Sequence, residues 1–195
     1  MDIARPKSVT EQLTNYRQLV TLADGLRVCL RPVQPGDREA LIALFNALAP
    51  EDLAYFRSHR TDANVAASWA EQPDYTQVFP LVAVVGDQLV GNSTLHLGSG
   101  PTRHVAEVRV FLLKEFRRRG IGTAMLKTQI DIARRLGLYQ LVAEIAENRP
   151  QVVHAFEHLG FERQCVLRDQ FITPEGETLD LILMVKYLRQ PAEEF

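Results

Sequence analysis

Two features of the sequence have residue types and spacings suited to chemistry. The first is the run RRRGIG at residues 117–122, in which three arginines lead directly into two closely spaced glycines. Arginine gives charge-assisted hydrogen bonds to phosphate oxygens, and glycine lets a phosphate approach the backbone because it has no Cβ. The second is Glu107, which with Arg109 interrupts the otherwise apolar stretch 104–113. The run predicts an anion site, and Glu107 is a candidate general base.

The elements around the run favour this interpretation. The apolar stretch 104–113 predicts a central strand buried on both faces, and residues 120–136 predict an amphipathic helix. A helix that starts directly after a glycine-bearing turn offers unpaired N–H groups and a positive dipole end to an anion. The alternative is that the arginines are solvated and the glycines only shape the turn. Neither the Gly-Lys-Ser/Thr ending of a nucleoside-triphosphate loop nor the third glycine of a dinucleotide-binding turn is present.

The remaining pattern predicts a single α/β (α+β) domain whose mixed, mostly antiparallel central sheet is flanked by helices. Asp24-Gly25 and Gly86-Asp87 predict two hairpin turns. Residues 1–15 are predicted to be a flexible N-terminal segment, residues 16–190 the domain, and residues 60–78 a less regular stretch. The other expected strands lie at 17–22, 26–32, 79–98 (a hairpin), 138–145, 161–172 and 178–188, and the other expected helices at 35–48, 50–59 and 148–160.

Composition limits the classes of function. The formal net charge is −2, so the chain has no overall attraction for nucleic acid, and RNA binding by the basic turn alone is the weakest alternative. The only cysteines, Cys29 and Cys165, have apolar neighbours and are expected to be buried free thiols. Cysteine and histidine spacing predicts no metal site, and no apolar run predicts a signal peptide or membrane span. We therefore expect a cytoplasmic protein without a membrane partner.

At the run RRRGIG the sequence resembles the GNAT superfamily of acetyl-CoA-dependent N-acetyltransferases, whose pattern is Arg/Gln-x-x-Gly-x-Gly/Ala. The preceding strand, the following helix, Asn148 and the stretch HLGF at 158–161 also fit, so the resemblance covers roughly residues 26–188. The N-terminal part is more loosely similar to GNAT domains of bacterial protein-lysine acetyltransferases. The resemblance implies a GNAT-like fold in which strand 104–113 and the next strand, LYQLVAEI, splay apart to admit the cofactor.

The resemblance also implies the site residues. The turn would hold the pyrophosphate of coenzyme A, the end of the preceding strand would pair with the pantetheine arm, and an asparagine would contact the cofactor. In the family some members carry a catalytic glutamate where this chain has Glu107; the alternative here is a structural Glu107–Arg109 pair. Asn148 is also a candidate helix cap. The expected cofactor-binding residues are Leu112, Leu113, Arg117, Arg118, Arg119, Gly120, Ile121, Gly122, Thr123 and Asn148.

The chain departs from the family at one position. Many members use a tyrosine on the last helix as general acid, and this chain has Phe156 there, which cannot donate a proton. His154 and His158 on the same helix are either solvated or catalytic. The expected function is acetyl transfer from acetyl-CoA to a primary amine, a protein lysine or a small molecule, by direct attack in a ternary complex. The alternative is a non-catalytic acyl-CoA-binding sensor. A homodimer is an expectation from the family resemblance alone.

Overall fold

The computed structural model describes residues 12–48, 63–173 and 175–188. In it, tight turns connect the first strands in antiparallel pairs. β1 (Gln18–Thr21) and β2 (Arg27–Pro32) pair antiparallel across a turn in which Gly25 has φ +83°. β3 (Val78–Val85) and β4 (Gln88–Leu97) pair in the same way across Gly86, with φ +60°. These antiparallel pairings confirm both predicted hairpins. Glycine suits the two turns because it adopts positive φ without steric cost.

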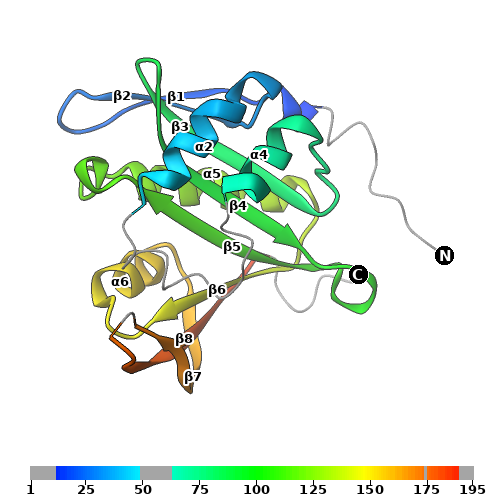
Figure 1. Ribbon diagram of the computed structural model, residues 1–195. Coiled ribbons are helices and arrows are strands. Elements are labelled where there is room, and N and C mark those ends of the chain that lie inside the picture. Colours follow the sequence, from blue (N-terminus) through cyan, green and yellow to red (C-terminus); the bar gives the residue numbers. More distant parts are fainter. Residues whose placement is uncertain (1–11, 49–62, 174, 189–195) are drawn as a thin grey trace.

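The strands form one eight-stranded sheet with the order β1-β2-β3-β4-β5-β6-β8-β7 (Figure 1). Neighbouring strands are antiparallel except for β5 and β6, which are parallel. The fold class predicted from the sequence is thus confirmed. The remaining described elements are η1 (Pro35–Asp37), α2 (Arg38–Asn46), α4 (Ala63–Glu71), η3 (Gly100–Thr102), β5 (Val105–Leu112), η4 (Lys114–Phe116), α5 (Ile121–Arg135), β6 (Gln140–Ala146), α6 (Pro150–His158), β7 (Glu162–Ile172) and β8 (Thr178–Tyr187).

β5 and β6 pair with each other only over their first few residues. Their parallel register consists of three residue pairs, from Val105↔Gln140 to Glu107↔Val142, and no pair joins them further along these two described strands. Figure 1 shows the two strands diverging beyond this point. The expected splaying of the central strands is confirmed. It also explains why residues 109–112 are only half-buried, although the sequence predicted burial on both faces.

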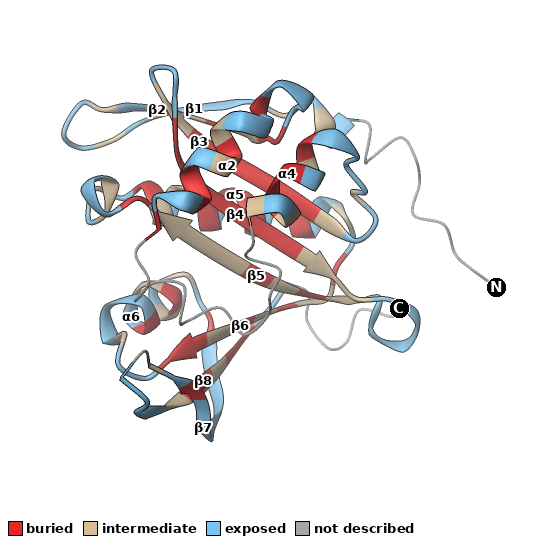
Figure 2. Cartoon of the chain, viewed as in Figure 1, coloured by how far each residue is buried: buried red, intermediate tan, exposed pale blue. Residues whose placement is uncertain are grey.

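Helices cover both faces of the sheet (Figures 1 and 2). α5 and α6 pack on one face, where Ile121 and Phe156 join a cluster with Ala106 and Val108 of β5. α2 and α4 pack on the other face, where Phe111 contacts the ring of Phe45 in α2 at a centroid distance of 4.7 Å. Because successive side chains of a strand point to opposite faces, Glu107 and Arg109 lie on the face of Phe111.

Some sequence-based expectations need correction. Within the stretch expected to be irregular, residues 63–71 form α4, whose buried contacts are made by the small side chains Ala66, Ala67 and Ala70. Cys165 is exposed on β7 rather than buried. Leu13, from the segment expected to be flexible, is 1% exposed and belongs to the core, whereas residues 1–11 and the helix expected at 50–59 lie outside the described residues.

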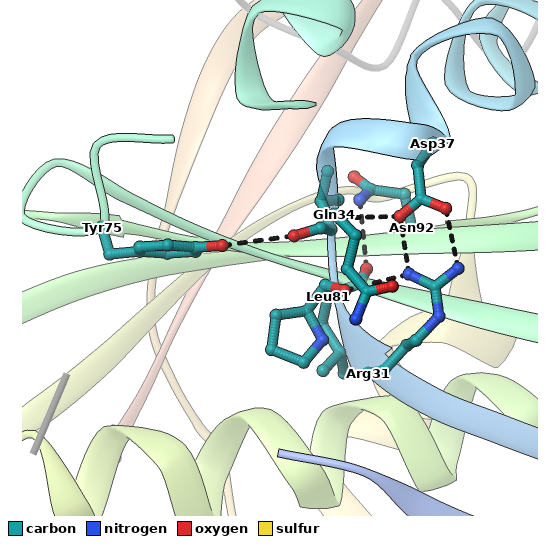
Figure 3. A network of polar contacts seen from close by, with 8 residues as sticks. Arg31, Gln34, Asp37, Tyr75, Leu81 and Asn92 are labelled. Carbon is teal, nitrogen blue, oxygen red and sulfur yellow. Dashed lines mark hydrogen bonds and ion pairs between the residues drawn. The ribbon is translucent and has the colours of Figure 1, made fainter. Parts of the chain in front are cut away.

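An ion pair of low exposure ties β2 to the start of α2 (Figure 3). Arg31 donates from Nη1 and Nη2 to the two carboxylate oxygens of Asp37 at 2.6 and 2.7 Å, and the side chains are 13% and 10% exposed. The Gln34 N–H donates to the same carboxylate at 2.7 Å. Hydrogen bonding to Asp37 raises the pKa of Arg31, against the opposing effect of burial. The pair therefore fixes the direction in which α2 leaves β2.

We predict that Asp37→Asn lowers the free energy of unfolding by about 3 kcal/mol, because it leaves a largely buried guanidinium without its counter-ion. Urea denaturation followed by circular dichroism measures the change. The matched control is Glu71→Gln, which breaks the exposed Arg38–Glu71 pair and should cost less than about 1 kcal/mol. Equal losses in the two variants would contradict a special role for the Arg31–Asp37 pair.

Candidate active site

The turn between β5 and α5 has an unusual backbone. Arg118 has φ +59° and Gly120 has φ +90°. Glycine adopts this region freely, whereas a non-glycine residue there is uncommon, and such conformations concentrate at ligand-binding turns. The turn is thus held in a shape that a relaxed arginine-rich loop would not adopt.

The first backbone N–H groups of α5, next to this turn, have no acceptor within the helix. The bond from Ala124 N–H to Gly120 O, 3.0 Å long, is the first of the helical ladder, so the amides of Ile121, Gly122 and Thr123 have no helical acceptor. The N-cap residue, Gly120, has no side chain that could cap these amides. Ile121 and Met125 are fully buried and anchor the helix to the sheet. These uncapped amides and the positive end of the helix dipole fit a phosphate group.

Two of the three arginines shape the turn. Arg117 donates from Nε to the carbonyl of Leu112 at 2.9 Å. Arg119 donates from Nε to Asp24 Oδ2 at 2.6 Å, which ties the turn to the β1–β2 hairpin. A hydrogen bond from the Leu26 N–H and this contact with Arg119 together lower the pKa of Asp24. Arg118 is exposed, so it is the arginine placed to reach a ligand.

The backbone of β5 presents hydrogen-bonding groups to the space left by β6. Leu113 N–H donates to Val90 O, and Val105 O accepts from Gly98 N–H, so the odd-numbered residues of this strand bond to β4. Alternation directs the backbone groups of the even-numbered residues to the opposite edge. Of the two leucines expected to pair with pantetheine, Leu112 faces the gap and Leu113 is committed to β4.

Polar side chains gather on the α2/α4 face of the sheet, next to the point where β5 and β6 separate. Arg109 donates from Nε and Nη2 to the two oxygens of Glu107 at 2.6 and 2.8 Å. Opposite them on β4, His96 is in register with Glu107 and Thr94 with Arg109. Thr94 Oγ1 and His96 Nε2 lie 2.9 Å apart. The pair considered in the sequence analysis is therefore present, and two further polar residues adjoin it.

Sequence reasoning did not single out Thr94 and His96. The only available signal was alternation, which puts Asn92, Thr94 and His96 on one face of β4. That signal could not show which residues of β5 would lie opposite, since this depends on the register of the two strands.

The residues on and next to α6 that the sequence analysis considered differ in exposure, and none lies beside the Glu107–Arg109 pair. The sequence suggested Asn148 as the cap of this helix, but the N-cap is Arg149, and the exposed Asn148 lies one residue before it. Phe156 is 3% exposed and packs edge-on against Phe161. His154 and His158 are exposed, and their rings contact each other. The structure does not bring these histidines to the Glu107–Arg109 pair, because α6 covers the opposite face.

Within the described ranges, no group of three or more His, Cys, Asp or Glu side chains is arranged to hold a metal ion. Among the described helices, none has the length and apolar character needed to cross a membrane.

The sequence profile of the acetyltransferase (GNAT) family matches residues 41–161 of the chain. The protein therefore belongs to this family, and it is an acyltransferase that uses acetyl-CoA as co-substrate. The uncapped start of α5 and the open edge of β5 fit the pyrophosphate and the extended arm of coenzyme A respectively.

Solved structures share the fold. A putative acetyltransferase from Salmonella typhimurium with its cofactor acetyl-CoA has 23% sequence identity and a TM-score of 0.74, covering 85% of this chain and 96% of its own. Ribosomal-protein-alanine N-acetyltransferase from Brucella melitensis has 26% identity and a TM-score of 0.71, covering 81% and 98%. Spermidine N-acetyltransferase from Vibrio cholerae, in complex with CoA and spermine, has 18% identity and a TM-score of 0.70, covering 83% and 95%.

We predict that Gly120→Ala weakens coenzyme A binding by about tenfold, because a Cβ is disfavoured at φ +90° and relaxation of the turn would redirect its amides. Isothermal titration calorimetry with coenzyme A measures the change. Gly176→Ala is the matched control, since Gly176 has φ +88° in the β7–β8 turn, away from the site. Unchanged affinity in Gly120→Ala, or equal losses in both variants, would contradict the assignment.

Proposed function

We propose that the protein transfers the acetyl group of acetyl-CoA to a primary amine by direct attack in a ternary complex. The observation that carries the proposal is the juxtaposition of three features: the uncapped start of α5, the open edge of β5 and the polar group around Glu107. The first two suit the donor. The third lies where the parallel pairing ends, beside the far end of the open edge, and suits the acceptor.

Each part of the site has a separate task in this mechanism. The turn at 117–122 binds the pyrophosphate, and the open edge of β5 aligns the pantetheine arm, with Leu112 as one partner. An N–H on that edge donates to the thioester carbonyl, where negative charge develops during attack. The acceptor ammonium must lose a proton before its nitrogen can attack, and Glu107 is the base proposed from the sequence. Asn148 is proposed as a further cofactor contact near the start of α6.

The leaving group needs no protein acid. Phe156 occupies the position of the family tyrosine, and its buried ring has no proton to donate. A thiol has an ordinary pKa of about 8.5, so its thiolate is a good leaving group and takes its proton from solvent.

The acceptor is proposed at the level of chemical class. Neighbours of this fold are named for spermidine and for ribosomal-protein alanine. The half-exposed carboxylate of Glu107 suits a cationic amine, whether from a protein lysine or from a small molecule. Homodimer formation and a cytoplasmic location stay predictions.

We expect acetyl-CoA to be converted to free thiol only when an amine is added. Thiol release is measured with spermine, with a peptide that has an N-terminal alanine, and with an N-terminally blocked peptide that contains one lysine. Product mass identifies the acetylated amine. Tight coenzyme A binding in calorimetry without turnover on any of these acceptors would favour the non-catalytic sensor, for which the absent tyrosine hydroxyl at Phe156 is the motivation.

We expect Glu107→Gln to lower kcat by more than about tenfold while the Kd for coenzyme A changes by less than about twofold, because the carboxylate faces the acceptor rather than the cofactor. Steady-state kinetics and calorimetry give the two quantities. Glu162→Gln, an exposed substitution on β7, is the control for loss of one negative charge. An unchanged rate in Glu107→Gln would remove Glu107 from the mechanism.

A further inference from the structure

The outer face of α6 carries two histidines that are one helical turn apart. His154 and His158 are both exposed, and α6 lies toward the periphery of the molecule (Figure 1). Side chains at positions i and i+4 of a helix are neighbours on one face. The centroids of the two rings are 4.3 Å apart, and the ring planes make an angle of 80°. The two imidazoles are therefore close enough to bind the same ligand.

The hydrogen bond at Nδ1 decides which nitrogen of His158 is basic. This atom lies 2.8 Å from the backbone carbonyl oxygen of His154. A carbonyl oxygen can only accept a hydrogen bond, so Nδ1 of His158 carries the proton and donates it. In the neutral ring the other nitrogen, Nε2, then holds the lone pair. His158 thus has its ligating atom at the end of the ring that points away from the helix backbone.

His154 has the same arrangement with a longer contact. Its Nδ1 lies 3.5 Å from Oε2 of Glu157, whose Oε1 accepts a hydrogen bond from Nε of Arg163 in β7 at 2.8 Å. An ionised carboxylate only accepts hydrogen bonds, so it favours the proton on Nδ1 and the lone pair on Nε2. Histidines that bind a metal commonly donate their other ring N–H to a carbonyl or a carboxylate. Both rings have a partner of this kind.

We propose that His154 and His158 bind one divalent transition-metal ion through their Nε2 atoms, with water molecules completing the coordination. Imidazole nitrogen suits Zn²⁺, Ni²⁺ and Cu²⁺, whereas Mg²⁺ and Ca²⁺ prefer oxygen ligands. The site has two protein ligands, fewer than the groups of three or more that the described ranges lack. Histidine spacing alone predicted no metal site. The partners of the two Nδ1 atoms, which the sequence does not show, are what indicate one.

The bound ion has a structural effect rather than a catalytic one. α6 packs on the sheet face opposite to the Glu107–Arg109 pair, so the ion is no cofactor of acetyl transfer. The two ligands are held at chelating distance only while the chain between them is helical. An ion that binds the folded protein in preference to the unfolded chain stabilises the folded protein. The proposed ion therefore stabilises the last turns of α6, a helix of nine residues.

Calorimetric titration of the full chain, without an affinity tag, with NiCl₂ tests the proposal at a pH above the ordinary titration of imidazole. We expect one ion per chain. His154→Gln and His158→Gln should each weaken binding by more than about tenfold, because the second imidazole no longer acts at high effective concentration. Affinity should rise from Mn²⁺ to Ni²⁺ to Cu²⁺, the order for nitrogen ligands.

The matched control keeps two histidines but changes their spacing. The double variant Val152→His/His158→Gln has histidines at i and i+2, which do not face each other, and Val152 is an exposed position. It should bind Ni²⁺ no more tightly than His158→Gln. Cys165→Ser removes the exposed thiol of β7 and should leave the affinity unchanged.

Two further readouts report the site directly. With Ni²⁺ at about 100 times its Kd, the midpoint of thermal unfolding should rise by about 5 °C in wild type and by less than about 1 °C in either histidine variant. Electron paramagnetic resonance of bound Cu²⁺ should show coupling to two nitrogens in wild type and to one in each variant.

Several results would overturn the proposal. They are wild-type affinity in either histidine variant or in the i, i+2 variant, coupling to a single nitrogen in wild type, and loss of binding in Cys165→Ser, which would assign the ion to the thiol. None of these measurements uses acetyl-CoA, so the metal site and the proposed acetyl transfer succeed or fail separately.

Discussion

The separation of β5 from β6 after three residue pairs is the constraint on which the site depends. A strand in the middle of a sheet ordinarily satisfies its backbone groups on both edges, and a buried group without a partner costs about 1–3 kcal/mol. Here, among the described residues, the edge of β5 beyond Glu107 has no strand partner on the β6 side, and the Leu112 carbonyl on it accepts a hydrogen bond from Arg117. An extended chain that carries its own amide groups is a natural complement to such an edge, and the pantetheine arm of coenzyme A is a chain of that kind.

The turn that follows β5 is held from several directions. Arg117 contacts the strand before the turn, Arg119 contacts the β1–β2 hairpin, and Ile121 anchors the helix after it. These contacts maintain the backbone at Arg118 and Gly120 in a region of φ that is costly for a free loop. The turn is therefore preorganised, and in the proposed anion site the binding free energy of the cofactor would not be spent on ordering it.

The sequence predicted the features that are local. Asp24-Gly25 and Gly86-Asp87 predict hairpins, and the glycines of the run RRRGIG predict a turn before a helix. These predictions succeed because the residues act through their own backbone preferences. α4 was missed because its buried positions are alanines, which give a weak periodic signal. His96 was missed because its significance comes from strand register. The hydrogen-bond partners of Arg117 and Arg119 were missed for the same kind of reason, because these contacts form only when separate segments of the chain pack together.

The β1–β2 hairpin is joined both to the turn that follows β5 and to the helix α5 after it. Asp24 contacts Arg119 in the turn, and Gln18 accepts a hydrogen bond from Thr128 in α5 at 2.8 Å. An outer edge of the sheet and the anion site are therefore thermodynamically linked, because whatever holds the turn and helix in one arrangement also holds the hairpin. An anion bound at the turn would then slow amide exchange in the hairpin as well, and fraying of the hairpin would shorten the lifetime of the complex.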